Sequence, residues 1–155
     1  MTFSVDIQVA DPRWRKVRGL ATRLRRSAEL ALVRGKARRS SSLTILLASN
    51  ERLKELNRNF RGLNKPTNVL SFPSDAKDDV YLGDVALAYE VTAGEAKDNG
   101  KRLADHAMHL TVHGVLHLLG FDHQSVRAAR KMEPLESEIL CELGVADPYA
   151  SEPAR

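Results

Sequence analysis

The chain has 155 residues, of which 43% are hydrophobic and 28% are charged, a balance typical of one globular domain and not of a disordered chain. The single Cys141, which lies among apolar residues and is expected in the core, excludes an internal disulfide. The sequence has no apolar stretch long enough to cross a membrane and no apolar region typical of an export signal. We therefore expect one domain over residues 1–155 of a cytoplasmic protein.

The net charge of +4 is unevenly distributed. Residues 1–61 contain fifteen Lys and Arg against five Asp and Glu, whereas residues 62–155 contain nine against fifteen. A basic half indicates a polyanionic partner such as RNA, but arginine-rich helix faces also occur on proteins that bind no nucleic acid. Aromatic residues make up 5% of the chain, so an RNA surface here cannot depend mainly on base stacking.

In the first part of the chain, the hydrophobic pattern predicts two strands and two helices. Residues 3–9 alternate apolar and polar side chains, as a half-buried strand does. Residues 11–33 open with Asp-Pro and continue with apolar residues at helical spacing, which predicts one helix. Residues 43–48 are nearly all apolar and predict a central strand covered on both faces. Asn50 is a candidate N-cap for a second helix, whose inward residues are Leu53, Leu56 and Phe60.

Further along, the same patterns predict strands at 69–72 and 81–88, and helices at 91–98, from about Leu103, and at 125–143. The helix from Leu103 is apolar nearly all round, which marks it as a buried central helix. Pro134 is a candidate kink in the last helix. The predicted fold is α+β: a single domain in which a four-stranded mixed sheet packs against a buried helix and several others.

All five histidines lie within residues 106–123. His113 and His117 are four residues apart, so a helix projects both from one face, within reach of a single metal ion. Gly120 can adopt the left-handed backbone that ends a helix and would bring His123 back toward the same ion. Three imidazoles leave a fourth position open, as in catalytic zinc sites, although imidazole also suits Ni, Cu and Fe. Zinc held in this way can generate a nucleophile at neutral pH.

The spacing His-x-x-x-His-x-x-Gly-x-x-His is that of the metzincin proteases, which place a glutamate directly after the first histidine as general base. Here that position is Gly114, which disfavours peptide hydrolysis. Phosphodiester cleavage could instead use the metal as Lewis acid, with a cationic side chain stabilising the developing charge. A metallopeptidase and a ribosome-binding module with a structural metal stay as alternatives. No general base is assigned, so water and a ribose 2′-hydroxyl are both candidate nucleophiles.

Three segments together resemble the YbeY family of bacterial endoribonucleases: HGVLHLLGFDH (His113–His123), KPTNVLSFP (Lys65–Pro73) and LGDV (Leu82–Val85). The resemblance covers essentially the whole chain and implies a zincin-like fold. It also implies a zinc-dependent, single-strand-specific endoribonuclease that matures the 3′ end of 16S rRNA and acts in ribosome quality control. Its implied partners are the 16S precursor and the ribosome or its small subunit.

The resemblance also implies roles for particular residues. His113, His117 and His123 match the ligands of one zinc ion, and Arg61, four residues before Lys65, matches a functionally important arginine. A guanidinium at this position suits phosphate oxygens, while a helix C-terminal arginine that binds the last carbonyls is the purely structural interpretation.

Other polar residues near these motifs have less definite roles. Lys65 is a candidate second phosphate contact, and Asp122 a candidate hydrogen-bond partner of a ligand imidazole. Asp84 could border the cleft and orient water or a ligand, or have a structural role. His109 could line the cleft, whereas His106 is expected to face solvent.

Overall fold

The computed structural model describes residues 2–61, 67–74, 80–121 and 126–148. In these ranges one mixed sheet contains four strands: β1 (Ser4–Val9), β2 (Ser42–Ala48), β3 (Val69–Pro73) and β4 (Tyr81–Ala88). The strand order is β1-β2-β4-β3. β1 pairs with β2 and β2 with β4 in parallel, whereas β3 joins the edge of β4 antiparallel. The predicted α+β fold with a four-stranded mixed sheet is confirmed.

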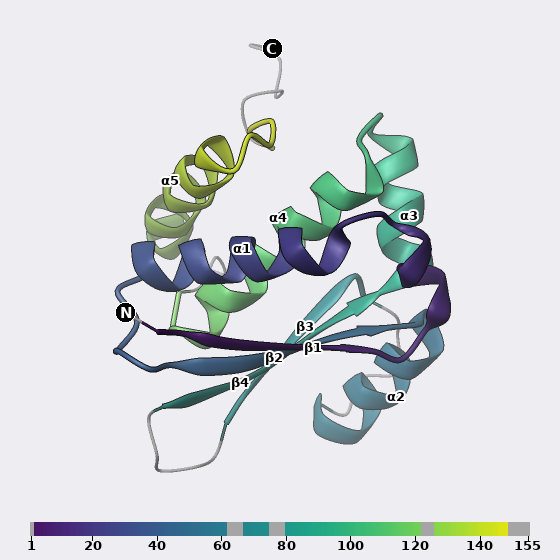
Figure 1. Cartoon of the computed structure of the whole chain (residues 1–155), viewed down its shortest axis with the longest axis horizontal. Coiled ribbons are helices and arrows are strands. Elements are labelled where there is room, and N and C mark those ends of the chain that lie inside the picture. The colour runs from purple at the N-terminus through teal and green to yellow at the C-terminus, as the bar shows by residue number, and fades with distance from the viewer. Residues whose placement is uncertain (1, 62–66, 75–79, 122–125, 149–155) are drawn as a thin grey trace.

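The helices are divided unequally between the two faces of the sheet (Figure 1). On one face lie α1 (Leu20–Arg34) and α4 (Leu103–Leu118), with α5 (Val126–Glu142) packed against both. α3 (Tyr89–Asp98) directly follows β4 and packs beside α4. α2 (Asn50–Arg61) lies on the opposite face. Among the described residues, no helix is both long and apolar enough to span a membrane.

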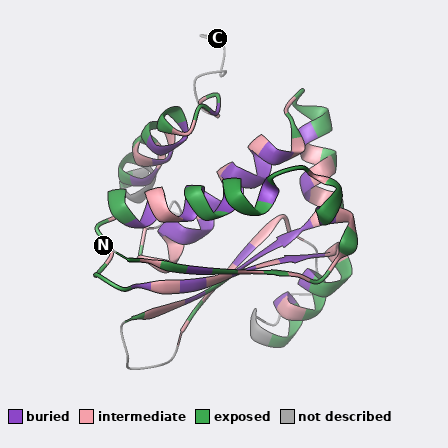
Figure 2. Ribbon diagram, viewed as in Figure 1, coloured by how far each residue is buried: buried purple, intermediate pink, exposed green. Residues whose placement is uncertain are grey.

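The main core lies between the sheet and α1, α4 and α5. The strand residues that face these helices alternate along each strand, as the pleat requires, and they are Val5, Leu43, Ile45, Leu47, Val85 and Leu87. Buried residues of the three helices fill the same core. They include Leu24, Leu32, Leu116, Met132 and Ile139, all of which are 0% exposed. α4 packs against β3 and β4 of the sheet and against α1, α3 and α5, and most of its residues are buried, which confirms it as the buried central helix (Figure 2).

The prediction that β2 is covered on both faces is wrong. Leu43, Ile45 and Leu47 are buried under the helices, but Thr44 and Leu46, which point the other way, are only half-buried. The reason is that α2 covers one end of that face, where its Leu53 packs in a cluster with Ala48, Leu70, Ala86 and Ala88. Among the described residues, no helix covers the rest of this face.

The predicted helix over residues 11–33 is interrupted. Asp11 caps a short 3₁₀ helix, Pro12–Lys16, by accepting a hydrogen bond from the backbone N–H of Arg13 at 3.0 Å. The buried Trp14 then donates its indole N–H to the carbonyl of Ala48 at 2.9 Å, which anchors this turn to the end of β2. The chain restarts as α1 after Gly19, whose φ of 66° is left-handed. A tertiary contact therefore breaks the helix that spacing alone predicts.

Two local expectations in α2 and α5 are also corrected. α2 is capped by Ser49, whose Oγ accepts from the N–H of Arg52 at 3.1 Å, and the Asn50 side chain instead accepts from the N–H of Val91 at 3.0 Å. Cys141 is exposed, because the inward residues of α5 are its neighbours Ile139 and Leu140. Pro134 lies inside α5 without ending it.

Candidate metal centre

Three histidines follow one another at four-residue intervals along α4. His109, His113 and His117 therefore lie on one face of the helix, as the spacing predicts. The opposite side of α4 is apolar and buried, with Val112, Val115 and Leu116 all at 0% exposure. The His113 side chain is 20% exposed, so a ligand can reach it from solvent.

The two candidate ligands converge. Nε2 of His113 and Nε2 of His117 lie 3.1 Å apart. Two imidazole nitrogens bound to one tetrahedral ion at about 2.0–2.1 Å each lie about 3.4 Å from one another. The donor pair therefore fits a metal ion with little rearrangement.

A buried glutamate, which the sequence did not reveal as a site residue, contacts two of these histidines. Glu136 of α5 is 0% exposed. Its Oε1 lies 3.1 Å from Nδ1 of His113 and its Oε2 lies 3.0 Å from Nε2 of His109. Burial alone would raise the pKa of Glu136, but the hydrogen bonds from His109 and His113 outweigh burial and lower its pKa to about 2. The Glu136 carboxylate therefore lies within hydrogen-bond distance of both rings.

A signal for Glu136 was present in the sequence. Glu136 lies in the inward stripe of α5 with Met132, Ile139 and Leu140, all of which are 0% exposed. A carboxylate in such a stripe must have a partner, because an unpaired buried charge is strongly unfavourable. The pattern does not reveal which residues of another helix are that partner.

Gly114, where the metzincins have their catalytic glutamate, is explained by packing. A Cβ built there would lie 2.6 Å from Cγ1 of Val85 and 3.2 Å from Oγ of Ser71. The same Ser71 donates a hydrogen bond to the carbonyl of Gly114 at 2.9 Å. α4 thus rests so closely on β3 and β4 that a side chain at position 114 would require them to separate.

Several predicted site residues fall outside what the structure describes. Lys65, Asp122 and His123 lie in the undescribed segments, and Arg61 is the last residue of α2, with a side chain that is likewise outside the description. Gly120 has a φ of 99°, as the predicted turn before His123 requires. Within the described ranges, no group of three His, Cys, Asp or Glu is placed to hold a metal.

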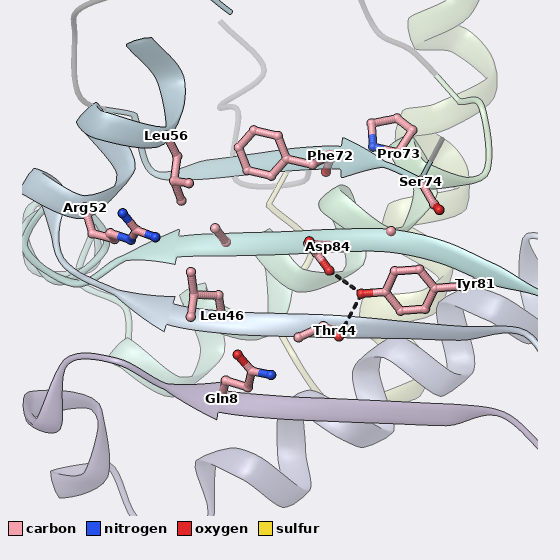
Figure 3. A pocket seen from close by; sticks show the side chains of 13 residues that line it. Gln8, Thr44, Leu46, Arg52, Leu56, Phe72, Pro73, Ser74, Tyr81 and Asp84 are labelled. Atoms are coloured by element: carbon pink, nitrogen blue, oxygen red, sulfur yellow. Dashed lines mark hydrogen bonds between the residues drawn. The ribbon is translucent and has the colours of Figure 1, made fainter. Parts of the chain in front are cut away.

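Asp84 is not brought to the histidines. Its neighbour Val85 faces α4, so the pleat directs Asp84 to the open face of the sheet. There the Tyr81 hydroxyl forms hydrogen bonds with Asp84 and with Thr44 (Figure 3). Asp84 does border a cavity, of about 730 Å³, but this cavity lies across the sheet from α4.

The expectation that His106 faces solvent is wrong. His106 is 9% exposed, and its Nε2 lies 2.9 Å from Oε1 of Glu95 in α3. Glu95 also accepts from the side-chain amide of Asn68 at 2.9 Å. This places the end of the KPTN segment against α3 and α4. Burial lowers the pKa of His106, although Glu95 opposes the shift.

Comparisons with known proteins agree with this architecture. The family model described as "Endoribonuclease YbeY" matches residues 9–144. A protein named endoribonuclease YbeY from Rhodopseudomonas palustris (strain BisB18) is 50% identical over 119 residues, covering 72% of this chain and 71% of the relative. A protein of the same name from Maricaulis maris is 42% identical over 149 residues, covering 96% of this chain and 93% of the relative.

The fold has a counterpart among solved structures. The solution structure of TM1509 from Thermotoga maritima superposes with a TM-score of 0.58 at 24% identity, covering 94% of this chain and 98% of that one. That likeness concerns the fold alone. Together with the matched family model and the sequence relatives, it leads to one conclusion: the chain belongs to the YbeY family of endoribonucleases.

Proposed function

We propose that this protein is a metal-dependent endoribonuclease that cleaves single-stranded RNA, with one zinc ion held by His113, His117 and His123. The observation that carries the proposal is the convergence of two Nε2 atoms to 3.1 Å on a buried, rigid helix. Membership of the family supports the RNA substrate, because the relatives are named endoribonucleases. His123 follows the left-handed Gly120, a turn that allows it to approach the same ion.

Each group has a distinct task in this proposal. His113, His117 and His123 would hold the zinc ion, which would supply Lewis-acid chemistry at this site. Arg61 offers forked donors to the phosphate and stabilises charge that develops during cleavage, and Lys65 adds a second phosphate contact. The close packing at Gly114 leaves no space for a zincin-type general base, which favours a phosphodiester over a peptide as substrate.

The proposed substrate in the cell is the precursor of 16S rRNA, cut near its 3′ end during small-subunit maturation and ribosome quality control in the cytoplasm. The KPTNVLSFP and HGVLHLLGFDH motifs support this assignment through their resemblance to the family. The positive charge on the surface of the N-terminal half also supports an RNA substrate. The exposed basic residues of this half include Arg15, Lys16, Arg18, Arg23 and Arg26.

The test combines metal analysis with cleavage of an end-labelled single-stranded RNA. Wild type, His113→Ala and Arg61→Ala are compared, with Arg58→Ala as control because Arg58 is exposed one turn earlier on α2. We expect about one zinc per wild-type chain, loss of metal and cleavage in His113→Ala, and loss of cleavage with retained metal in Arg61→Ala. Full cleavage by His113→Ala would overturn the proposal. Normal rRNA processing by Arg61→Ala would indicate a binding module instead.

The ends of the RNA products identify the nucleophile. A 2′,3′-cyclic phosphate with a 5′-hydroxyl on the downstream fragment shows attack by the ribose 2′-hydroxyl and excludes direct attack by water. A linear phosphate formed without a cyclic precursor shows attack by water.

A further inference from the structure

We propose that Glu136 is the positioning residue of the metal centre: its buried carboxylate holds the Nδ1–H of His113, so that the unprotonated Nε2 of this ring faces the metal position. The second carboxylate oxygen holds His109 and thereby completes the pairing of the buried charge. This inference rests on the proposed metal function and deepens it.

The hydrogen-bond chemistry leads to one tautomer of His113. Both oxygens of the buried Glu136 carboxylate lie within hydrogen-bond distance of a histidine ring, and the 3.1 Å contact of Oε1 points to a proton on Nδ1 of His113. A neutral imidazole has one ring proton, and Nε2 therefore presents a lone pair toward His117. A carboxylate behind a histidine ligand raises the basicity of the ligand and fixes the plane of its ring.

The contact with His109 makes the arrangement stable without metal. Glu136 is 0% exposed, and a carboxylate at that depth is strongly destabilising unless its oxygens accept hydrogen bonds. Nε2 of His109 supplies the second donor, 3.0 Å from Oε2. His109 lies one turn before His113 on α4, so one glutamate holds two successive rings of the same helix face.

Packing and ion pairs on two sides of α5 restrict the position of Glu136. Met132, one turn before it, and Leu140, one turn after it, are both 0% exposed in the main core. On the outer face, Glu138 and Glu142 of α5 form ion pairs with Arg34 of α1, the first at 2.8 Å. The carboxylate of Glu136 therefore has little freedom to leave the two histidines.

The same helix offers a matched control. Glu138 is two residues along, has a 55% exposed side chain and pairs with Arg34 of α1. Glu138→Gln removes an equal charge from α5 without touching the histidines. Glu136→Gln keeps the size of the side chain but removes the charge, and Glu136→Ala removes the hydrogen bonds as well.

The experiment uses the full chain and has two readouts and a control for folding. Competition with a chromophoric chelator measures zinc affinity. Long-range ¹H–¹⁵N NMR of the zinc-free protein reports which nitrogen of His113 is protonated, and thermal melting reports folding. We expect Nδ1–H on His113 in wild type, zinc affinity about 10- to 100-fold lower in Glu136→Gln, and no change in Glu138→Gln.

Two results would overturn the role of Glu136: a His113 protonated on Nε2 in zinc-free wild type, or unchanged zinc affinity in a folded Glu136→Gln. The tautomer measurement on wild type needs no variant, so it decides the matter even where substitutions at position 136 prevent folding. Failure of wild type itself to bind zinc would overturn the proposed function, and it is thus distinct from a failure confined to Glu136.

Discussion

Nε2 of His113 and Nε2 of His117 lie 3.1 Å apart, close to the separation of about 3.4 Å at which two imidazoles share one tetrahedral metal ion. Because both rings are needed for that geometry, we expect His117→Ala to bind zinc at least 100-fold more weakly than wild type and to lose RNA cleavage. Zinc titration and a cleavage assay check this, with circular dichroism to show that the variant is folded. A folded His117→Ala that cleaves at the wild-type rate would contradict the assignment.

The packing of Gly114 against Val85 gives a prediction about stability. Gly114→Ala places a Cβ 2.6 Å from Cγ1 of a stiff, β-branched side chain, and we expect it to lower the free energy of unfolding by about 1–3 kcal/mol. Gly94→Ala is the control, since a Cβ at this position in α3 meets nothing within 4 Å. That control should stabilise the protein by about 0.4–1 kcal/mol. Urea unfolding measures both.

A double variant tests the cause of the Gly114 effect. The double variant Gly114→Ala with Val85→Ala should lose less stability than the sum of the two single losses, because Val85→Ala removes the atoms that the new methyl group meets. Strict additivity of the two losses would show that the contact with Val85 is not responsible. Gly114→Glu should destabilise the fold further and create no peptidase activity.

The burial of His106 predicts a dependence of stability on pH. Burial lowers the pKa of this histidine below its ordinary 6.5. Glu95 opposes this shift, whereas the charges of His109 and Lys101 add to it. Below about pH 6.5 the unfolded chain therefore binds a proton that the folded chain resists, so the free energy of unfolding falls as pH decreases. The loss levels off once the pH is below the folded-state pKa.

His106→Gln checks this prediction. Urea unfolding between pH 7.5 and 5 should show a shallower decline for the variant than for wild type, because one source of differential proton binding has been removed. An identical or steeper decline in His106→Gln would contradict it.

The exposed arginines of α1 predict how RNA binding depends on salt. Arg23 and Arg26 are exposed, and each phosphate contact they make should add about 0.7 to the slope of log K against log salt for a single strand. Arg23→Gln and Arg26→Gln should each lower that slope, measured by fluorescence anisotropy. Arg34→Gln is the control, because Arg34 is already paired with Glu138 and Glu142. If the slope is the same for every variant and wild type, Arg23 and Arg26 do not contact the RNA.

Elements with strong hydrophobic periodicity could be predicted from the sequence. β1, β4 and α4 occur where alternation or an apolar run indicates them, and the four-residue spacing correctly places His113 and His117 on one helix face. These features depend only on local geometry. The family resemblance, carried by motifs far apart in the chain, is likewise confirmed.

Features that depend on tertiary contacts could not be predicted. The break before α1 follows from the bond between Trp14 and Ala48, residues 34 positions apart. Strand alternation indicates that Asp84 and Val85 point to opposite faces, but not which face α4 covers. Glu136 shows in the sequence only as a charge in an apolar stripe, and its partners lie on another helix.

The central claim is that cleavage of single-stranded RNA depends on one metal ion at His113 and His117. The most direct measurement removes metal from wild type with a chelator, returns zinc in known amounts, and follows cleavage of a single-stranded RNA and a matched duplex. We predict that single-strand cleavage stops on removal and returns in full at about one zinc per chain, while the duplex stays intact. Undiminished cleavage by the metal-free protein, or none after zinc is restored, would contradict the account.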